Sequence, residues 1–311
     1  MKDVCFFNRW HNGDVFAGKG WIQDIMRQVP DINYGYAHVN NPKIVADLDC
    51  VHMSYDVLPA GIADHVRFAV NDTTVFINTW IGSYVDEVLK PGEQHGNWPN
   101  LHHMWTLIYD KLNEINGMNL VMDANPLKYV PVTTWAPYRT DLADNFTARH
   151  FDATGFHLFC NGIVRSYQSR LDYMSEVIQN LAKRHTDHIF ICTAKEFTTD
   201  LPNVFFTEDI FGLDSDINEI AYLSTHPMCY SIVGKNSGPY MYCHVRENIF
   251  NKDKQFVSLS HRPSDSYPWG TTGIQCHYTH CLSESAVRIT TVIDDIVNNH
   301  QVGTGEVRVV G

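Results

Sequence analysis

The chain has 311 residues, a formal net charge of −12 and 44% hydrophobic residues, which is typical of a globular protein with one large or two ordinary domains. This acidic balance argues against a large non-specific affinity for nucleic-acid backbone, although a local basic groove is compatible with it. The sequence has no run of about 18 apolar residues. We therefore expect no membrane insertion.

The start of the chain and its cysteines indicate the compartment. The first nine residues become polar too early for a signal peptide. The eight cysteines lie singly, without a C-x-x-C pair, and several occur in apolar strand-like runs where a thiol packs as a small hydrophobe. These features predict reduced thiols and a cytoplasmic protein.

The first half of the chain predicts one α/β unit. Its elements follow from apolar side chains that recur with the period of a strand or of a helix. In chain order, we expect a strand at 4–8, a loop at 11–14, a helix at 21–28, a strand at 75–81 and a helix at 101–115. The section 117–152 contains three prolines and is predicted to be looser.

The second half alternates strands and helices more regularly. We expect a strand and turn at 156–162, a helix at 169–184, strands at 188–192 and 203–207, a helix from Asp216 to 223 with Glu219 in a capping box, a strand at 229–233, a helix after 239, a strand at 256–260 and a helix at 284–299. This alternation predicts the α/β class, with a parallel sheet covered by helices on both faces. The predicted domains are 1–152 and 153–283, followed by a helix and tail at 284–311 able to return to the first domain.

The loop Gly234-Lys235-Asn236-Ser237-Gly238 joins a predicted strand to a predicted helix. The glycines allow a ligand to approach the backbone closely, and N–H groups at the start of a helix attract anions. Ser237 adds a hydroxyl and Lys235 a positive charge. We therefore expect a phosphate site, with an ordinary tight turn as the simpler alternative.

Three segments resemble one protein family. In "DSDINEIAYLSTHPMCYSIVGKNSGPYMYCHV", the run Asn236-Ser237-Gly238-Pro239 resembles the N-D-S-G-P-x-H loop that closes the nucleotide site of GT-B glycosyltransferases, above all the heptosyltransferase-like family. Lys235-Asn236 replaces the family's Asn-Asp, so the loop carboxylate is missing. Gly13-Asp14 in "NRWHNGDVFAGKGWIQDI" and Glu196 in "FICTAKEF" are similar to two further family segments.

The resemblance implies a GT-B fold, with two Rossmann-like α/β/α domains that face each other across a cleft. It implies that Asp14 is the general base, and His11 is the alternative because its unperturbed pKa lies near neutrality. It places Gly13 near the donor phosphates and a basic residue on them, for which Arg165 and Arg170 are candidates. It also places Glu196 on the ribose, and we expect Thr193 and Asp209 to complete the nucleoside site.

The acceptor side is expected in the first domain. Thr79 and Trp80 end the strong predicted strand there, and His102 and His103 lie in a segment rich in His and Trp that is equally compatible with a loop leading into a helix. Simpler explanations exist for several candidates. Asp14 can cap a helix, Trp80 can be a core residue, and Arg165 and Glu196 can be solvated surface residues.

The implied function is transfer of a sugar from a nucleotide-activated donor to a hydroxyl, with inversion and without a metal or cofactor. The acceptor stays open between a glycan and a modified nucleic acid such as a hydroxymethylated DNA base. An epimerase of the same fold that acts on nucleotide sugars and a non-catalytic nucleotide- or sugar-binding protein are alternatives.

Two other patterns allow metal chemistry. Cys276-His277-x-x-His280-Cys281 offers zinc ligands at an uncommon spacing. Two D-x-D triplets, at 47–49 and 214–216, resemble the Mn²⁺ motif of GT-A enzymes, although Asp216 also suits a helix cap.

Overall fold

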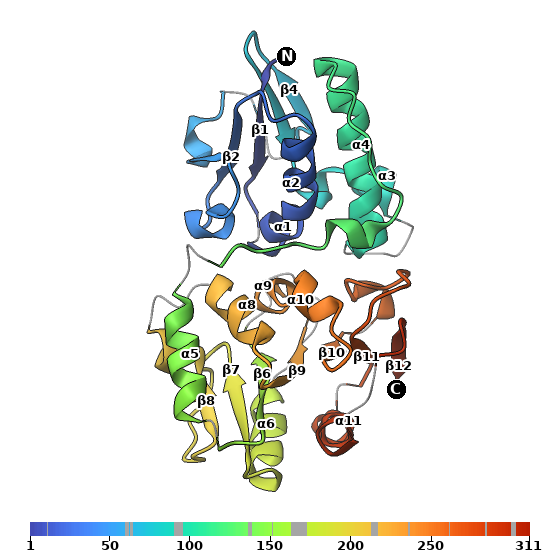
Figure 1. Ribbon diagram of the computed structural model, residues 1–311. Coiled ribbons are helices and arrows are strands. Elements are labelled where there is room, and N and C mark those ends of the chain that lie inside the picture. Colours follow the sequence, from blue (N-terminus) through green and yellow to red (C-terminus); the bar gives the residue numbers. More distant parts are fainter. Residues whose placement is uncertain are drawn as a thin grey trace. The chain divides into compact units, whose positions relative to one another are not determined.

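The computed structural model describes residues 1–10, 12–59, 62, 65–89, 96–135, 139–150, 152–162, 173–212, 217–235, 237–260, 262–283, 285–299 and 303–311. The chain divides into two compact units, Met1–Pro137 and Tyr138–Gly311. Each unit is built around its own sheet (Figure 1). None of the helices in the described ranges is long and apolar enough to cross a membrane.

The first unit contains a five-stranded sheet. Its strands are β1 (Asp3–Asn8), β2 (Tyr34–His38), β3 (Val51–Met53), β4 (Phe68–Val70) and β5 (Thr74–Asn78). Their order is β3-β2-β1-β5-β4, and all neighbours pair in parallel except β4 and β5. The helices are α1 (Asn12–Ala17), α2 (Lys19–Gln28), α3 (Val85–Val88) and α4 (Trp98–Asn116), with 3-10 turns η1 (Pro42–Val45), η2 (Tyr55–Val57), η3 (Ile81–Ser83) and η4 (Pro126–Tyr129).

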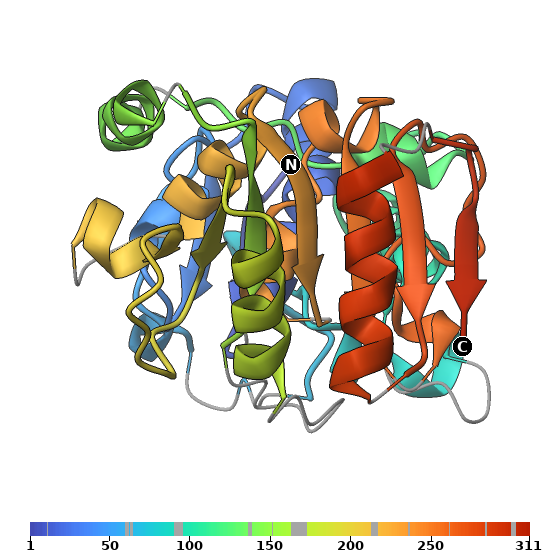
Figure 2. The ribbon, with the colours of Figure 1, turned by 90° about the horizontal axis from the view of Figure 1, so that it is seen from below.

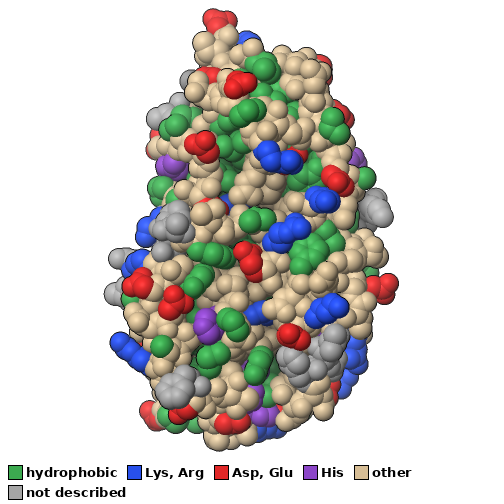
Figure 3. Space-filling view, in the orientation of Figure 1, with side chains coloured by type: hydrophobic (Ala, Val, Ile, Leu, Met, Phe, Trp, Pro, Cys, Tyr) green, Lys and Arg blue, Asp and Glu red, His purple; other side chains and the backbone are tan. Residues whose placement is uncertain are grey.

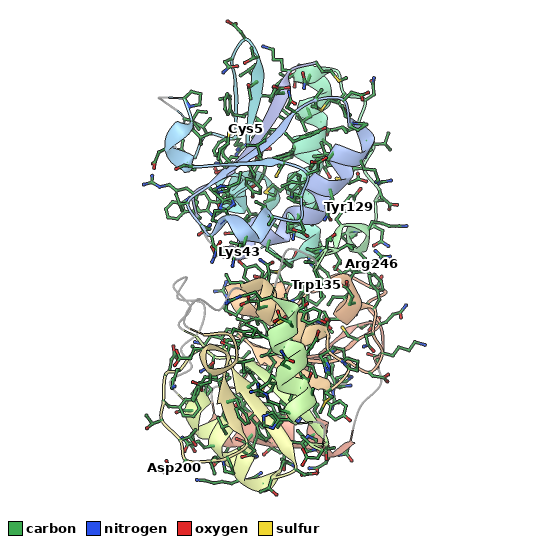
Figure 4. All side chains as sticks on the ribbon, turned by 60° about the vertical axis from the view of Figure 1, so that its left-hand side comes forward. Cys5, Lys43, Tyr129, Trp135, Asp200 and Arg246 are labelled. Atoms are coloured by element: carbon green, nitrogen blue, oxygen red, sulfur yellow. The ribbon has the colours of Figure 1, made fainter. Side chains whose placement is uncertain are left out.

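Aromatic rings pack the helices of this unit onto one face of its sheet. Trp21 of α2 stacks on Trp105 of α4 at 5.7 Å and on Tyr129 of η4 at 5.2 Å between ring centroids. Figure 4 labels Tyr129 in the first unit. Trp105 in turn lies 6.2 Å from Phe6 of β1. On the other face, Cys5, Phe7, Ala37 and Phe76 pack against side chains of the segment around η2. Among the described residues, short turns rather than long helices therefore cover that second face.

A buried ion pair fixes the start of α2. The Lys19 ammonium lies 2.5 Å from the Asp47 carboxylate, and both side chains are fully buried. Lys19 also lies 5.0 Å from the centroid of the Phe16 ring. Burial lowers the pKa of Lys19, whereas the Asp47 charge beside it acts in the opposite direction. The carboxylate therefore keeps a cation tolerable in this interior.

The second unit contains a seven-stranded sheet in which all neighbours pair in parallel. Its order is β12-β11-β10-β9-β6-β7-β8. The strands are β6 (Gly155–Cys160), β7 (His188–Cys192), β8 (Val204–Phe206), β9 (Cys229–Gly234), β10 (Gln255–Leu259), β11 (His277–Cys281) and β12 (Val307–Val310). The helices are α5 (Thr140–Arg149), α6 (Met174–Arg184), α7 (Thr207–Phe211), α8 (Ile217–Thr225), α9 (Gly238–Tyr242), α10 (Arg246–Ile249) and α11 (Ala286–Asn299), with the 3-10 turn η5 (Pro263–Asp265).

Helices α6 and α11 lie side by side over one face of this sheet (Figure 2). Their apolar stripes, which include Ile178, Leu181, Ile289 and Ile293, share one core with residues of the strands. Because β12 also pairs with β11, the segment predicted as a returning tail at 284–311 forms part of the second unit where it is described.

The predicted domain boundary differs from the observed division by one helix. We expected the second domain to start at 153, whereas the second unit starts at Tyr138 and includes α5. Contacts with α8 explain this, since Arg139 forms a bidentate pair with Glu219, and the Tyr222 hydroxyl donates to Asp144 at 3.0 Å. Glu219 therefore binds an arginine. Asp216, its predicted partner in a capping box, lies outside the described residues.

Most predicted strands and helices are observed within a few residues of their expected bounds. The prediction of a loop at 11–14 is wrong, because the helix α1 begins at Asn12. The strand predicted at 75–81 ends at Asn78, and 81–83 form the turn η3.

Replacing Asp47 by Ala removes the carboxylate beside the buried Lys19 ammonium. We expect this change to lower the free energy of unfolding by roughly 3–5 kcal/mol, as is typical when one partner of a buried pair is lost. Urea unfolding measures the effect. The neighbouring exposed Asp49→Asn is the matched control and should cost less than about 0.5 kcal/mol. Equal losses in the two variants would contradict a stabilising pair.

Candidate active site

The centre of the second sheet is a topological switch point. From β6, the chain proceeds towards β7 and β8 on one side and later returns to β9 on the other. Sheets of this kind bind ligands outside the carboxyl ends of the strands where the order reverses. The register pairs Cys160 with Gly234, so the loops after β6 and β9 start at the same level. The predicted phosphate loop therefore lies at the position where such sheets bind ligands.

The loop after β9 has a fixed start and an unsatisfied hydroxyl. A Cβ on Gly234 would lie 2.8 Å from both the Cys160 Cβ and the Tyr240 ring, so only glycine fits there. Lys235 is only 5% exposed. Ser237 caps α9 by position, yet its side chain makes no capping bond, and its buried Oγ has no hydrogen-bond partner within the described ranges.

The helix contributes less to this loop than the sequence indicated. Helix α9 has only five residues, so its dipole is small. The Ser237 N–H already donates to the Lys235 carbonyl at 2.7 Å. Among the described residues, the Ser237 hydroxyl is therefore the group of this loop without a hydrogen-bond partner, and the Gly238 N–H and the Lys235 charge belong to the same loop. Asn236 lies outside the described residues.

An asparagine connects the neighbouring strand ends. The Asn161 side chain donates to the Ala194 carbonyl at 2.8 Å and accepts from the Ala194 N–H at 3.0 Å. These two bonds hold the loop after β7 beside the loop after β6. We did not predict Asn161 as a site residue, although a buried Asn directly after an apolar strand is a visible signal.

The three predicted nucleoside residues all follow β7 or β8. The Thr193 Oγ1 is buried without a partner among the described residues. Glu196 is exposed. Asp209 pairs with Lys195 at 3.0 Å, and Glu208 pairs with the same ammonium at 3.1 Å. Glu196 is thus accessible to a ligand and the Thr193 hydroxyl is buried, whereas Asp209 already has a cationic partner.

Three further candidates, His11, Arg165 and Arg170, lie outside the described residues. In the first unit, Gly13 is buried in α1 and Asp14 lies in the first turn of that helix. Part of Asp14 stays accessible, yet its surroundings are dense enough that burial raises its pKa to about 7. A carboxyl with such a pKa suits a general base near neutral pH.

Asp14 belongs to a polar cluster at the carboxyl ends of the first sheet. The Tyr36 hydroxyl lies 2.8 Å from the Thr79 hydroxyl, and the Asn8 amide donates to the same oxygen at 3.4 Å. Burial raises the pKa of Tyr36, and the charge of Asp14 adds to this rise. Thr79 is buried, so it supports this cluster from inside.

Trp80 is partly exposed and packs against Trp10, with ring centroids 4.8 Å apart. We did not predict Trp10. The signal was nevertheless present, because Asn-x-Trp occurs twice, at 8–10 and at 78–80.

The predicted histidines do not join Thr79 and Trp80. His102 lies in α4 and packs against Trp21 and Tyr129, at 6.4 and 5.6 Å between ring centroids. Its pKa is lowered by burial. His103 is exposed on the same helix. The segment rich in His and Trp was compatible with a binding site or with a loop leading into a helix. The structure shows the helix, which begins at Trp98.

The suspected metal patterns have other roles. In β11, Cys276 and His280 point to one side of the sheet and His277 and Cys281 to the other, since side chains alternate along a strand. His280 bonds to Ser266 and His277 to Thr279. Asp47 of the first D-x-D triplet binds Lys19, and the second triplet lies outside the described residues. Among the described residues, no three His, Cys, Asp or Glu side chains gather as metal ligands do.

Two α/β units with mostly parallel sheets, arranged in this chain order, define the GT-B class of fold, and solved structures share it over nearly the whole chain. The E. coli heptosyltransferase WaaC with ADP is 10% identical and aligns with a TM-score of 0.52, covering 96% of this chain and 99% of that one. E. coli ADP-heptose lps heptosyltransferase II is 12% identical, with a TM-score of 0.56 and the same coverage. At these identities, the likeness establishes the fold.

Sequence comparisons gave no such relatives. A scan against protein-family models found no match, and a search of curated proteins found none either.

Replacing Asp14 by Asn should stabilise the protein at alkaline pH. Because the folded-state pKa is about 7 and the ordinary value is 3.8, the native state holds this proton more tightly than the unfolded state. The stability that this tightly held proton contributes to the folded state is therefore lost as pH rises from about 4 to about 7. We expect Asp14→Asn to gain roughly 2–4 kcal/mol at pH 8 and little at pH 4, by urea unfolding. The exposed Asp110→Asn is the control, and a pH-independent difference would contradict the raised pKa.

Proposed function

We propose that the chain is a glycosyltransferase that moves a sugar from a nucleotide-activated donor to an acceptor hydroxyl, with inversion and without a metal requirement. The observation that carries this proposal is the loop 234–238. It lies at the switch point of the second sheet, and its Ser237 hydroxyl is buried with no hydrogen-bond partner among the described residues.

The second unit supplies the groups for a donor diphosphate. Ser237 and the Gly238 N–H donate hydrogen bonds, and Lys235 adds positive charge in surroundings that exclude most water, where an ion pair is stronger than in bulk solvent. Asn161 keeps the loop that carries Thr193 and Glu196 beside this position. The similar WaaC structure contains ADP, so ADP is a sensible first probe for this loop.

The first unit supplies the base. Asp14 takes the proton from the acceptor hydroxyl, and the resulting oxygen attacks the anomeric carbon from the face opposite the diphosphate. The bond between that carbon and the diphosphate oxygen breaks with its electron pair on the leaving group, so the anomeric configuration inverts. A pKa of about 7 keeps the Asp14 carboxylate basic enough to accept this proton.

Ser237→Trp should abolish binding of nucleoside diphosphates by filling the loop. We expect ADP, UDP or GDP to raise the Tm of the wild-type protein and to leave the variant unchanged, measured by differential scanning fluorimetry with and without EDTA. Ser285→Trp is the matched control, because Ser285 is exposed and directly precedes α11 of the same unit. A wild-type protein that binds no diphosphate would show that the loop is only a turn.

Asp14→Asn should lower the rate of donor hydrolysis by roughly 10²–10⁴-fold, the usual contribution of a general base. The nucleotide released from a panel of nucleotide sugars measures this rate, with water as the acceptor. In the wild-type protein the rate should rise with pH and level off above about 7, where Asp14 is ionised. Asp110→Asn should keep both rate and profile. A variant at position 14 with the wild-type rate would exclude this carboxylate as the base.

A further inference from the structure

Two neighbouring strands of the first sheet end in the same way. Strand β1 runs into Asn8-Arg9-Trp10, and β5 runs into Asn78-Thr79-Trp80. In each case the Asn Oδ1 accepts the N–H of the tryptophan two residues on, at 2.9 Å for Asn8 and 3.0 Å for Asn78. These are Asx turns, in which a short amide side chain fixes the local backbone. Because β1 and β5 pair in parallel, the two turns bring both indoles to the same edge.

The two indoles are held firmly. Both asparagines are almost fully buried, and the Asn78 amide also donates to the Val66 carbonyl and to Ser83. The Trp10 carbonyl accepts a bond from Asn40 at 2.9 Å.

Close contacts also fix the Trp80 ring, because a Cβ on Gly82 would lie 2.1 Å from it. The indoles meet with centroids 4.8 Å apart at an angle of 35°, and Trp10 remains 38% exposed. The structure thus keeps a rigid, partly exposed pair of large aromatic side chains at a surface, and contiguous exposed apolar surface is where ligands or partners bind.

We propose that the pair Trp10–Trp80 is the platform on which a sugar ring of a glycan acceptor lies, with its C–H face on the indoles. This inference rests on the proposed function and adds the class of acceptor. The pair follows the two strands on either side of the switch between β1 and β5, and α1 with Asp14 begins two residues after Trp10. A sugar on the platform would therefore lie at the edge of the sheet that also carries the base.

The geometry favours a sugar over a nucleobase. Enzymes that act on a flipped base usually hold it between two side chains. Here the indoles already contact each other, so no ring fits between them, and a ligand has to lie across their outer surface.

The charge also opposes a nucleic acid. The first unit has nine Lys and Arg against fifteen Asp and Glu, and nucleic-acid binding depends on an excess of cations. On the face shown in Figure 3, acidic and basic side chains are interspersed.

Binding of neutral oligosaccharides to the full chain tests this inference. We would measure cellohexaose, maltohexaose and chitohexaose by calorimetry and by intrinsic tryptophan fluorescence, with a single-stranded DNA 20-mer as the competing probe. The wild-type protein should bind at least one oligosaccharide with a change in fluorescence. The double variant Trp10→Ala/Trp80→Ala should bind it about tenfold more weakly or not at all, whereas Trp10→Phe/Trp80→Phe, which keeps two aromatic faces, should lose less.

The outcomes separate this inference from the proposed function. All variants are also titrated with ADP, UDP and GDP, whose binding should not change because the donor loop belongs to the other unit. If the wild-type protein binds a diphosphate but no oligosaccharide, whether or not it binds DNA, the platform is overturned and the proposed donor site is unaffected. Oligosaccharide binding that survives in the Ala variant also overturns it. Oligosaccharide binding through the indoles without any diphosphate binding supports the platform and overturns the glycosyltransferase.

Discussion

The register between β6 and β9 is the constraint on which the candidate donor loop depends. It sets Cys160 opposite Gly234, and no side chain fits at the second position because the Cys160 Cβ and the Tyr240 ring occupy that space. The two strands therefore approach closely at their carboxyl ends, and the chain must leave β9 without a side chain in the way. The start of the candidate phosphate loop, and with it the Ser237 hydroxyl that has no partner among the described residues, follows from this packing requirement.

Two carboxylates of the first unit show how similar burial leads to opposite roles. Asp47 neutralises a buried ammonium, so the two charges satisfy each other and serve the fold. Asp14 is surrounded just as densely, and nothing among the causes of its raised pKa offsets the burial. A group kept in surroundings that disfavour its charged form lowers stability, and such groups tend to occur where chemistry requires them. This contrast favours Asp14 over the acidic triplet as the functional carboxylate.

Periodicity predicted the long elements well, because α4, α6, α11 and the central strands bury continuous apolar faces. It missed β2 and β12, whose short sequences take their structure from pairing with other strands, and it missed α1, which has only six residues. The sequence was informative about the candidate site where one residue is notable by itself, as is Ser237 at the start of α9. It was not where contacts cross the sequence: His102 is held by Trp21, and Trp10 matters only because Trp80 lies beside it.

The strand order of the second sheet also fixes the order in which its parts become available during synthesis. Strand β6 emerges first and lies in the middle, its neighbours β7 and β9 follow, and β12 comes last at an edge. Both loops of the switch point can therefore be in place while β10, β11 and β12 are still missing from the sheet. A ribosome would thus present both switch-point loops beside one open, unpaired sheet edge, and such an edge is exposed to mispairing.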